Sequence, residues 1–143
     1  MRTIKEIIIH CTATPQNWTP QNFVNEWKNK GWKIGGYHYI IYPDGTIDHT
    51  IKNEQISNGC RGHNAHAINV AYVGGVDAQG RARDNRTAAQ RESLLHLIVQ
   101  LRELHPKATI IGHRDIWGTN PRTWLKMCPS FDVQKWLHDV NVK

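Results

Sequence analysis

The sequence lacks any long apolar run. The longest uninterrupted stretch, Val70–Val76, includes two glycines, and a membrane-spanning helix needs about 18 or more apolar residues. The N-terminal region also lacks the apolar core of a signal peptide, because the charged side chains of Lys5 and Glu6 stand where that core would lie. We therefore expect no transmembrane segment and a protein that is made in the cytoplasm without a signal peptide.

Cysteine is scarce as well. The chain has three cysteines in 143 residues, and three thiols cannot all pair within one chain, whereas a small disulfide scaffold uses more. At least one cysteine is then a free thiol or a metal ligand. Internal repeats, low-complexity segments and Pro/Ser-rich linkers are also missing, so residues 1–143 are expected to form a single domain.

Basic residues do not occur in blocks, although Lys and Arg outnumber Asp and Glu by 18 to 12 and give a net charge of +6. Scattered positive charge favours anionic partners through long-range attraction. Zinc-finger spacings, aromatic RNA-binding motifs and helix-turn-helix signatures are absent. Nucleic acid is therefore not expected as a partner, and other polyanions, such as bacterial wall polymers, fit the charge.

Strand and helix patterns that follow one another predict an α/β domain with a central mixed β-sheet and helices packed on it. Runs of β-branched residues predict buried strands, and an Asp-Gly turn predicts a hairpin. Capping residues followed by apolar side chains at helical spacing predict three helices. The predicted strands are residues 3–9, 37–42, 46–51, 68–73 and 109–111, and the predicted helices begin at Thr19, Thr87 and Ser130, the first ending at Gly31 and the second before Pro106.

His10 and His113 each follow a short isoleucine-rich strand. Neighbouring strand ends in a sheet lie about 5 Å apart, so the two imidazoles could converge, and Cys128 in a late loop could join them. Two imidazoles and one thiolate form a zinc site with an open fourth position. The alternatives are hydrogen-bonded imidazoles and an inert thiol, or a structural zinc site closed by Cys11 or Asp115. Asp115 is otherwise expected to orient an imidazole or to cap a helix.

Six short motifs occur in one order along the chain. They read IIIHCTAT at 7–14, GGYHYII at 35–41, DG at 44–45, VGGVD at 73–77, IGHRD at 111–115 and KMCPSFD at 126–132. With these motifs the sequence resembles the zinc-dependent N-acetylmuramoyl-L-alanine amidases, a family that includes bacteriophage lysozymes of the amidase type and peptidoglycan recognition proteins. The resemblance covers nearly the whole chain and implies a single zinc amidase catalytic domain.

The resemblance implies that His10, His113 and Cys128 bind zinc and that Tyr37 and Lys126 are catalytic. It implies hydrolysis of the amide bond between N-acetylmuramic acid and L-alanine in peptidoglycan. Zinc would activate water at neutral pH, since it lowers the pKa of bound water from 15.7 to about 7. The Lys126 ammonium would stabilise the oxyanion, and the Tyr37 hydroxyl would hydrogen-bond the reacting oxygen or pass a proton towards the leaving amine.

The resemblance also implies a biological setting. We expect a phage or prophage endolysin, a monomer that acts on the bacterial cell wall after a separate membrane lesion releases it. An interbacterial effector with the same chemistry would share these sequence features. The alternative from another class is a peptidoglycan-binding or partner-regulating module of the same fold without catalysis, and the joint presence of all five site residues argues against it.

Two segments depart from the family pattern. Gly59 stands about where the family often has a histidine, and His63 stands where it has a tyrosine. The resemblance implies that this loop borders the substrate groove. The stretch 116–125 is longer than in the shortest relatives, and the indoles of Trp117 and Trp124 are expected either to stack on sugar faces or to pack within the groove wall.

Overall fold

The computed structural model of the chain describes residues 2–143. Five strands form one sheet in the spatial order β3-β2-β4-β1-β5, in which β2 and β3 are antiparallel and the other neighbours are parallel. The strands are β1 (Glu6–Cys11), β2 (Tyr39–Ile41), β3 (Ile47–His49), β4 (Ala67–Tyr72) and β5 (Thr109–Gly112). The predicted α/β domain with a mixed sheet is confirmed.

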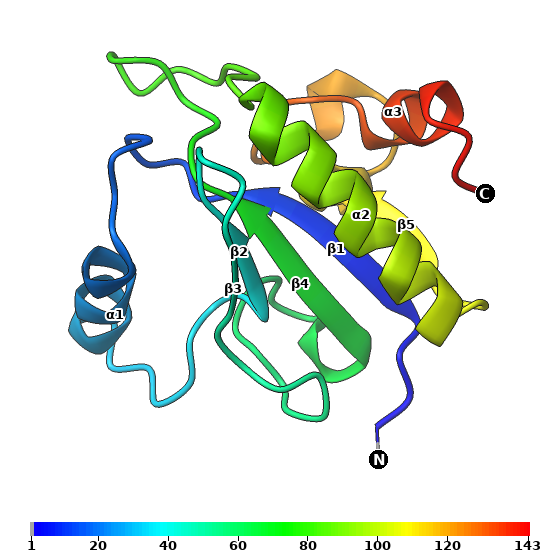
Figure 1. The fold of residues 1–143 in the computed structure, drawn as a ribbon, viewed down its shortest axis with the longest axis horizontal. Helices are drawn as coiled ribbons and strands as arrows, with labels where there is room; N and C mark the ends of the chain where they lie inside the picture. The colour runs from blue at the N-terminus through cyan, green and yellow to red at the C-terminus, as the bar shows by residue number, and fades with distance from the viewer. Residues whose placement is uncertain (1) are drawn as a thin grey trace.

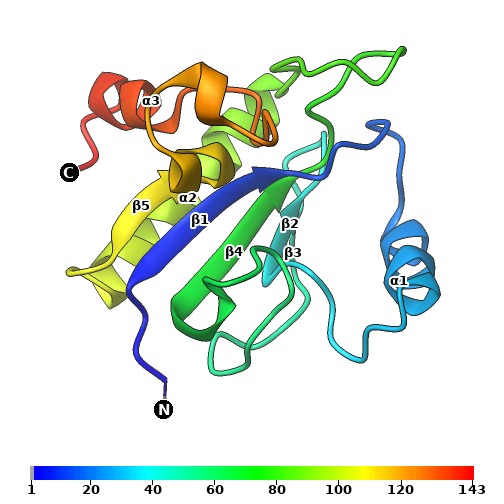
Figure 2. The ribbon, with the colours of Figure 1, turned by 180° about the vertical axis from the view of Figure 1, so that it is seen from behind.

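Helices flank this sheet unevenly. The α-helices are α1 (Pro20–Asn29), α2 (Ala88–Leu104) and α3 (Val133–Asp139), and the short 3-10 helices are η1 (Asn64–His66), η2 (His113–Trp117) and η3 (Pro121–Thr123). Helix α2 runs across one face of the sheet, α3 lies near β5, and α1 stands apart on the side of β2 and β3 (Figure 1). Seen from behind, the opposite face is exposed to view, with no α-helix across it (Figure 2). Within residues 2–143, every helix is too short or too polar to cross a bilayer.

Alternate residues of the central strand β1 face opposite sides of the sheet, as the pleat requires. Ile7 and Ile9 pack into the main core with Leu94 of α2. Ile8 packs on the other face, against the loop between β3 and β4. The apolar run is continuous because both faces of the strand are buried. His10 has the parity of Ile8, so its side chain lies on the face away from α2.

The predicted N-caps Thr19 and Thr87 are confirmed, and each forms a capping box. Thr19 pairs with Asn22 at the start of α1, and Thr87 pairs with Gln90 at the start of α2. In each box the threonine side chain accepts a hydrogen bond from the backbone N–H three residues on, while the amide side chain accepts from the threonine N–H. Helix α1 ends at Asn29 with Lys30 as its C-cap, and Gly31 follows with a φ of 75°, the left-handed conformation typical of glycine after a helix.

The prediction that Ser130 caps the last helix was wrong. Asp132 is the N-cap of α3 and accepts a hydrogen bond from the backbone N–H of Lys135 at 3.1 Å. Ser130 has a φ of 68°, which is incompatible with the extended conformation of an N-cap residue. Its hydroxyl instead donates to the backbone carbonyl of Gly75 at 2.8 Å, so the loop before α3 is fixed by a distant contact.

Three predicted strands need corrected limits. Strand β1 begins at Glu6 rather than at residue 3, and it continues to Cys11, so it includes His10, which was expected to follow it. The two hairpin strands have only three residues each, because β2 pairs with β3 over no more than the positions 39–41 and 47–49. The chain before β2 and after β3 forms loops, and Tyr37 and Gly59 of these loops line the cleft described next.

Candidate functional site

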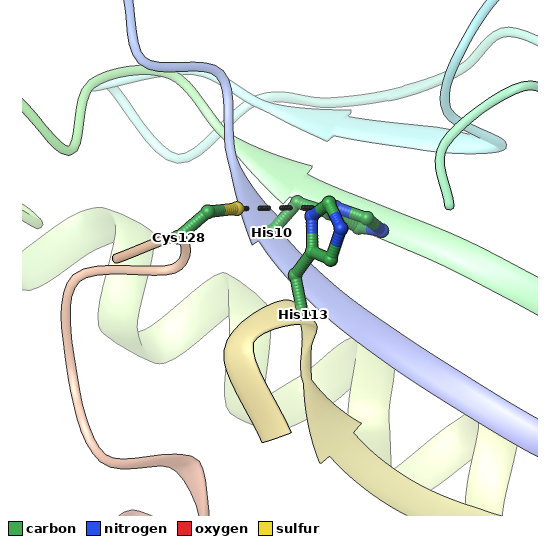
Figure 3. Close-up of side chains that lie close together, drawn as sticks. All are labelled: His10, His113 and Cys128. Atoms are coloured by element: carbon green, nitrogen blue, oxygen red, sulfur yellow. Dashed lines mark hydrogen bonds between the residues drawn. The ribbon is translucent and has the colours of Figure 1, made fainter. Parts of the chain in front are cut away.

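Three candidate ligand residues, His10, His113 and Cys128, converge at the ends of β1 and β5. The two strands are parallel neighbours, and their pairing brings the imidazole centroids of His10 and His113 to 4.8 Å. The Cys128 sulfur lies 3.9 Å from Nδ1 of His10. In Figure 3 the three side chains point towards one another from β1, from the start of η2 and from the loop before α3. One ligand atom of each residue lies within 4.8 Å of the other two.

Backbone contacts hold the loop with Cys128 in this position. The Arg114 N–H donates to the Cys128 carbonyl at 2.8 Å, and the Cys11 N–H donates to the Cys128 sulfur at 3.2 Å. Gly112 permits the close approach, because a Cβ on this residue would lie only 2.9 Å from Cδ of Pro129. The loop therefore packs directly against the end of β5, next to His113.

Burial makes the two histidines neutral. His10 is 1% exposed, and burial followed by the nearby His113 lowers its pKa to about 3. Burial and the charge of Lys126 lower the pKa of His113 to about 4. Burial raises the pKa of the Cys128 thiol, so a metal ion would have to displace its proton. Two neutral imidazoles and one thiol, with ligand atoms this close, fit the nitrogen and sulfur preference of zinc.

Neither residue considered as a fourth ligand joins the cluster. The Cys11 sulfur lies in the main core, 3.9 Å from the Ser130 hydroxyl. The Asp115 carboxylate accepts a hydrogen bond from the Gly112 N–H at 2.8 Å and so caps η2. Apart from binding zinc, Asp115 was expected either to orient an imidazole or to cap a helix, and the structure shows it as a helix cap. Within residues 2–143 the candidate cluster consists of three side chains, and all three line a cleft.

The cleft has a volume of about 450 Å³, and both candidate catalytic residues line it. The Tyr37 ring centroid lies 5.2 Å from that of His10. Burial raises the pKa of the Tyr37 hydroxyl well above its usual range, so the group stays neutral and can donate a hydrogen bond. Lys126 is exposed, and its charge contributes to the lowered pKa of both His10 and His113.

The rest of the cleft wall is partly aromatic. Trp117 lines the cleft and stacks on His113 with ring centroids 5.4 Å apart. Trp124 is not among the described residues that line the cleft. The Arg114 guanidinium lies 4.1 Å from its ring, and its indole N–H donates to the Gly118 carbonyl. Gly59 lies at the cleft, whereas the His63 imidazole lies 2.8 Å from the Glu6 carboxylate.

One residue of the site is missed by sequence reasoning. Asn69 of β4 is fully buried, and its side-chain oxygen lies 2.8 Å from Nε2 of His10. A polar residue within the apolar run 68–73 is the signal that could have revealed it, because buried polar groups require hydrogen-bond partners. Its partner was not evident, since the pairing of β1 with β4 is a property of the folded sheet.

Comparison with known proteins places the chain in a family. The sequence profile of the N-acetylmuramoyl-L-alanine amidase family (Amidase_2) matches residues 1–130. The chain is 34% identical over 134 residues to an endolysin of Enterobacteria phage K11, covering 92% of this chain and 84% of that protein. It is 34% identical over 132 residues to an endolysin of Escherichia phage T7, covering 91% and 83%. A solved structure of the N-acetylmuramoyl-L-alanine amidase LysC from Clostridium intestinale URNW matches with a TM-score of 0.80 and 27% identity, over 99% of this chain and 88% of that one. The chain therefore belongs to the N-acetylmuramoyl-L-alanine amidase family.

Proposed function

We propose that this protein is a zinc-dependent amidase that hydrolyses the bond between N-acetylmuramic acid and L-alanine of peptidoglycan, and that it serves as a phage or prophage endolysin. The observation that carries the proposal is the convergence of His10, His113 and Cys128 in one cleft of a chain from this family. The similarity to phage endolysins over more than nine tenths of the chain supports the biological setting.

The three candidate ligands leave room for catalysis. His10 and His113 offer neutral nitrogen atoms, and Cys128 offers a sulfur that becomes a thiolate when it binds metal. These three residues would hold zinc, which would supply Lewis-acid chemistry by lowering the pKa of a water molecule and polarising the carbonyl group of the substrate. The cleft beside the ligands gives the scissile amide access to this point.

Lys126 and Tyr37 carry the remaining chemistry. Attack on an amide carbonyl places negative charge on its oxygen, and the Lys126 ammonium at the cleft stabilises that charge. The nitrogen of the leaving L-alanine must gain a proton. The neutral Tyr37 hydroxyl donates a hydrogen bond to the reacting oxygen and relays a proton from the attacking water to that nitrogen, so that Tyr37 is neutral again at the end of the reaction. The positive net charge of the protein assists its approach to an anionic wall.

The test is the release of free stem peptides from purified sacculi. The protein should release peptides with a new N-terminal alanine, a metal chelator should stop the release, and added zinc should restore it. The His113→Ala variant, which lacks one candidate ligand, should stay inactive after zinc is added. Binding to sacculi without release would indicate the non-catalytic binding module instead, and new reducing sugar ends without free peptides would indicate a glycosidase.

A further inference from the structure

Asn69 lies at the centre of a buried polar network beneath the candidate ligands. Its side chain shares a sheet face with His10, and no part of it is exposed. Its Nδ2 donates to the Ser57 hydroxyl at 2.7 Å and to Oδ1 of Asn64 at 3.2 Å. Its backbone N–H donates to Nδ1 of His38 at 3.0 Å. An amide buried this deeply is tolerated because each of its polar atoms has a partner.

The network fixes which way the Asn69 amide points. The backbone N–H of Cys60 can only donate, so the Asn64 atom that meets it at 2.8 Å is the side-chain oxygen. The same oxygen lies 3.2 Å from the Asn69 side chain, and the Asn69 atom on that side must therefore be the donor Nδ2. Oδ1 of Asn69 is left facing His10.

This orientation determines the position of the proton on His10. Oδ1 of Asn69 can only accept, and it lies 2.8 Å from Nε2 of His10. Nε2 therefore carries the proton, and in a neutral imidazole the other nitrogen then has the lone pair. That nitrogen, Nδ1, is the atom 3.9 Å from the Cys128 sulfur. The ligand atom of His10 thus faces the candidate metal position.

A second layer of contacts prevents the Asn69 amide from turning. Its Nδ2 donates to Ser57, and the Ser57 hydroxyl in turn donates to Nδ1 of His38 at 3.3 Å. Nε2 of His38 donates to the Gln55 carbonyl at 2.7 Å. His38 and Ser57 are fully buried. Rotation of the amide would place its oxygen against Oδ1 of Asn64, which also only accepts, and would take from the Ser57 hydroxyl the donor that leaves that hydroxyl free to donate to His38.

Gly59 provides the space for this arrangement. A Cβ on Gly59 would lie 2.5 Å from Cγ of Asn69 and 2.8 Å from its side-chain oxygen. Any other residue at position 59 would therefore displace the Asn69 amide. Gly59 is also the position at which the sequence departs from the histidine often found in the family pattern. The absence of a side chain there leaves room for the Asn69 amide.

We propose that Asn69 is a positioning residue that holds His10 in its Nε2-protonated tautomer and presents Nδ1 to zinc. The inference rests on the proposed zinc site and adds to it the side chain that orients one ligand. Partners of this kind raise metal affinity by fixing the ligand before binding, and their loss costs about 10- to 100-fold in affinity.

Zinc affinity tests the proposal directly. We expect Asn69→Leu, which keeps the side-chain shape but cannot accept a hydrogen bond, to weaken zinc binding about 10- to 100-fold in competition with a chromophoric chelator. Asn69→Asp should bind zinc to within a few-fold of the wild-type affinity, because its carboxylate accepts the same hydrogen bond. Gln90→Leu is the matched control, because it removes another buried amide. The Nε2 of Gln90 donates to the carbonyls of Ile41 and Val73, and its loss should leave zinc affinity unchanged.

A second measurement does not depend on metal, and its result for the wild type does not depend on a variant that folds. Long-range proton–nitrogen NMR of the zinc-free wild type should show His10 protonated at Nε2, and Asn69→Leu should show a mixture of tautomers. A His10 protonated at Nδ1 in the wild type, or equal zinc affinity of the wild type and Asn69→Leu, would overturn the inference. Failure of the wild type to bind zinc would instead refute the proposed zinc site, while the tautomer assignment would still be judged by NMR.

Discussion

The ammonium of Lys126 lies at the cleft, near enough for its charge to lower the pKa of both candidate histidine ligands. If it stabilises the oxyanion, Lys126→Ala should lower kcat on purified muropeptides by about 10²- to 10³-fold, the range typical of a lost oxyanion donor. Zinc content should not change, because Lys126 is not one of the three candidate ligands. Lys28→Ala, which removes an exposed lysine of α1, is the control, and full activity of Lys126→Ala would remove this residue from the mechanism.

Tyr37 contributes a hydroxyl rather than a charge. Tyr37→Phe keeps the ring that packs 5.2 Å from His10 and removes only the donor. We expect a loss of activity of about 10²-fold or more, as for other side chains that take part in proton transfer, with zinc binding and stability retained. Turnover of muropeptides and metal analysis of the same sample measure both effects. Unchanged turnover would show that the ring alone matters.

Gly59 is constrained by space rather than by backbone conformation. A Cβ at this position would meet the Gly36 carbonyl oxygen at 2.7 Å as well as the Asn69 amide. Gly59→Ala should therefore lower the free energy of unfolding by about 1–3 kcal/mol, the usual cost of overpacking. Urea unfolding measures this loss. Gly62→Asn, at a nearby glycine with open surroundings and a φ of 87° that asparagine tolerates, should cost much less, and similar losses in both variants would contradict the steric argument.

At the scale of single elements, the start of α2 is held by a capping box. The Thr87 hydroxyl accepts from the Gln90 N–H at 3.0 Å and donates to the Pro43 carbonyl at 2.7 Å, which joins the helix to the hairpin turn. Thr87→Ala should lower the free energy of unfolding by about 0.5–2 kcal/mol. Thr3→Ala, at an exposed position, serves as the control. Equal unfolding midpoints in urea would show that the cap contributes nothing.

Much of the element pattern is predictable because its signals are local. The strands β1, β4 and β5 follow runs of β-branched residues, and α1 and α2 begin at caps whose partners lie three residues away. The start of α3 was not predictable in this way. The conformation of Ser130 depends on a contact with Gly75 that is 55 residues distant, and the lengths of β2 and β3 depend on which residues find partners in the sheet.

The candidate ligands show the same division between local and distant information. The convergence of His10 and His113 could be anticipated from two strand ends, but it required β1 and β5 to be neighbours, and strand order cannot be read from the chain. The position of Cys128 in a late loop made it only one possible ligand, and the family resemblance was needed to single it out. The role of Asn69 depends on the parity and register of β4 against β1, which no local pattern contains.

At the scale of the whole molecule, buried neutral histidines make stability depend on pH. Burial lowers the pKa of His38 from 6.5 to about 4. Between these values the unfolded chain binds a proton that the folded protein does not, so stability falls as the pH drops below 6.5. At pH 5 this one group should cost about 2 kcal/mol, at 1.36 kcal/mol per pH unit. Above pH 6.5 it should have no effect.

The measurement is urea unfolding at pH 7 and pH 5 in one buffer system, for the wild type and for His38→Gln. The glutamine keeps polar atoms at this buried position but does not titrate. The variant should lose less free energy between the two pH values than the wild type does, whatever its stability at pH 7. An equal loss in both proteins would show that His38 is not one of the groups that destabilise the fold in acid.

His10 and Cys128 lie 118 residues apart in the chain, and the strand that carries His10 needs β4 on one side and β5 on the other. During synthesis the first candidate ligand is therefore made 118 residues before the sulfur. The three candidate ligands cannot meet until the chain has been made through Cys128. Products of translation that stops before this residue would lack the complete set and would be inert towards a cell wall.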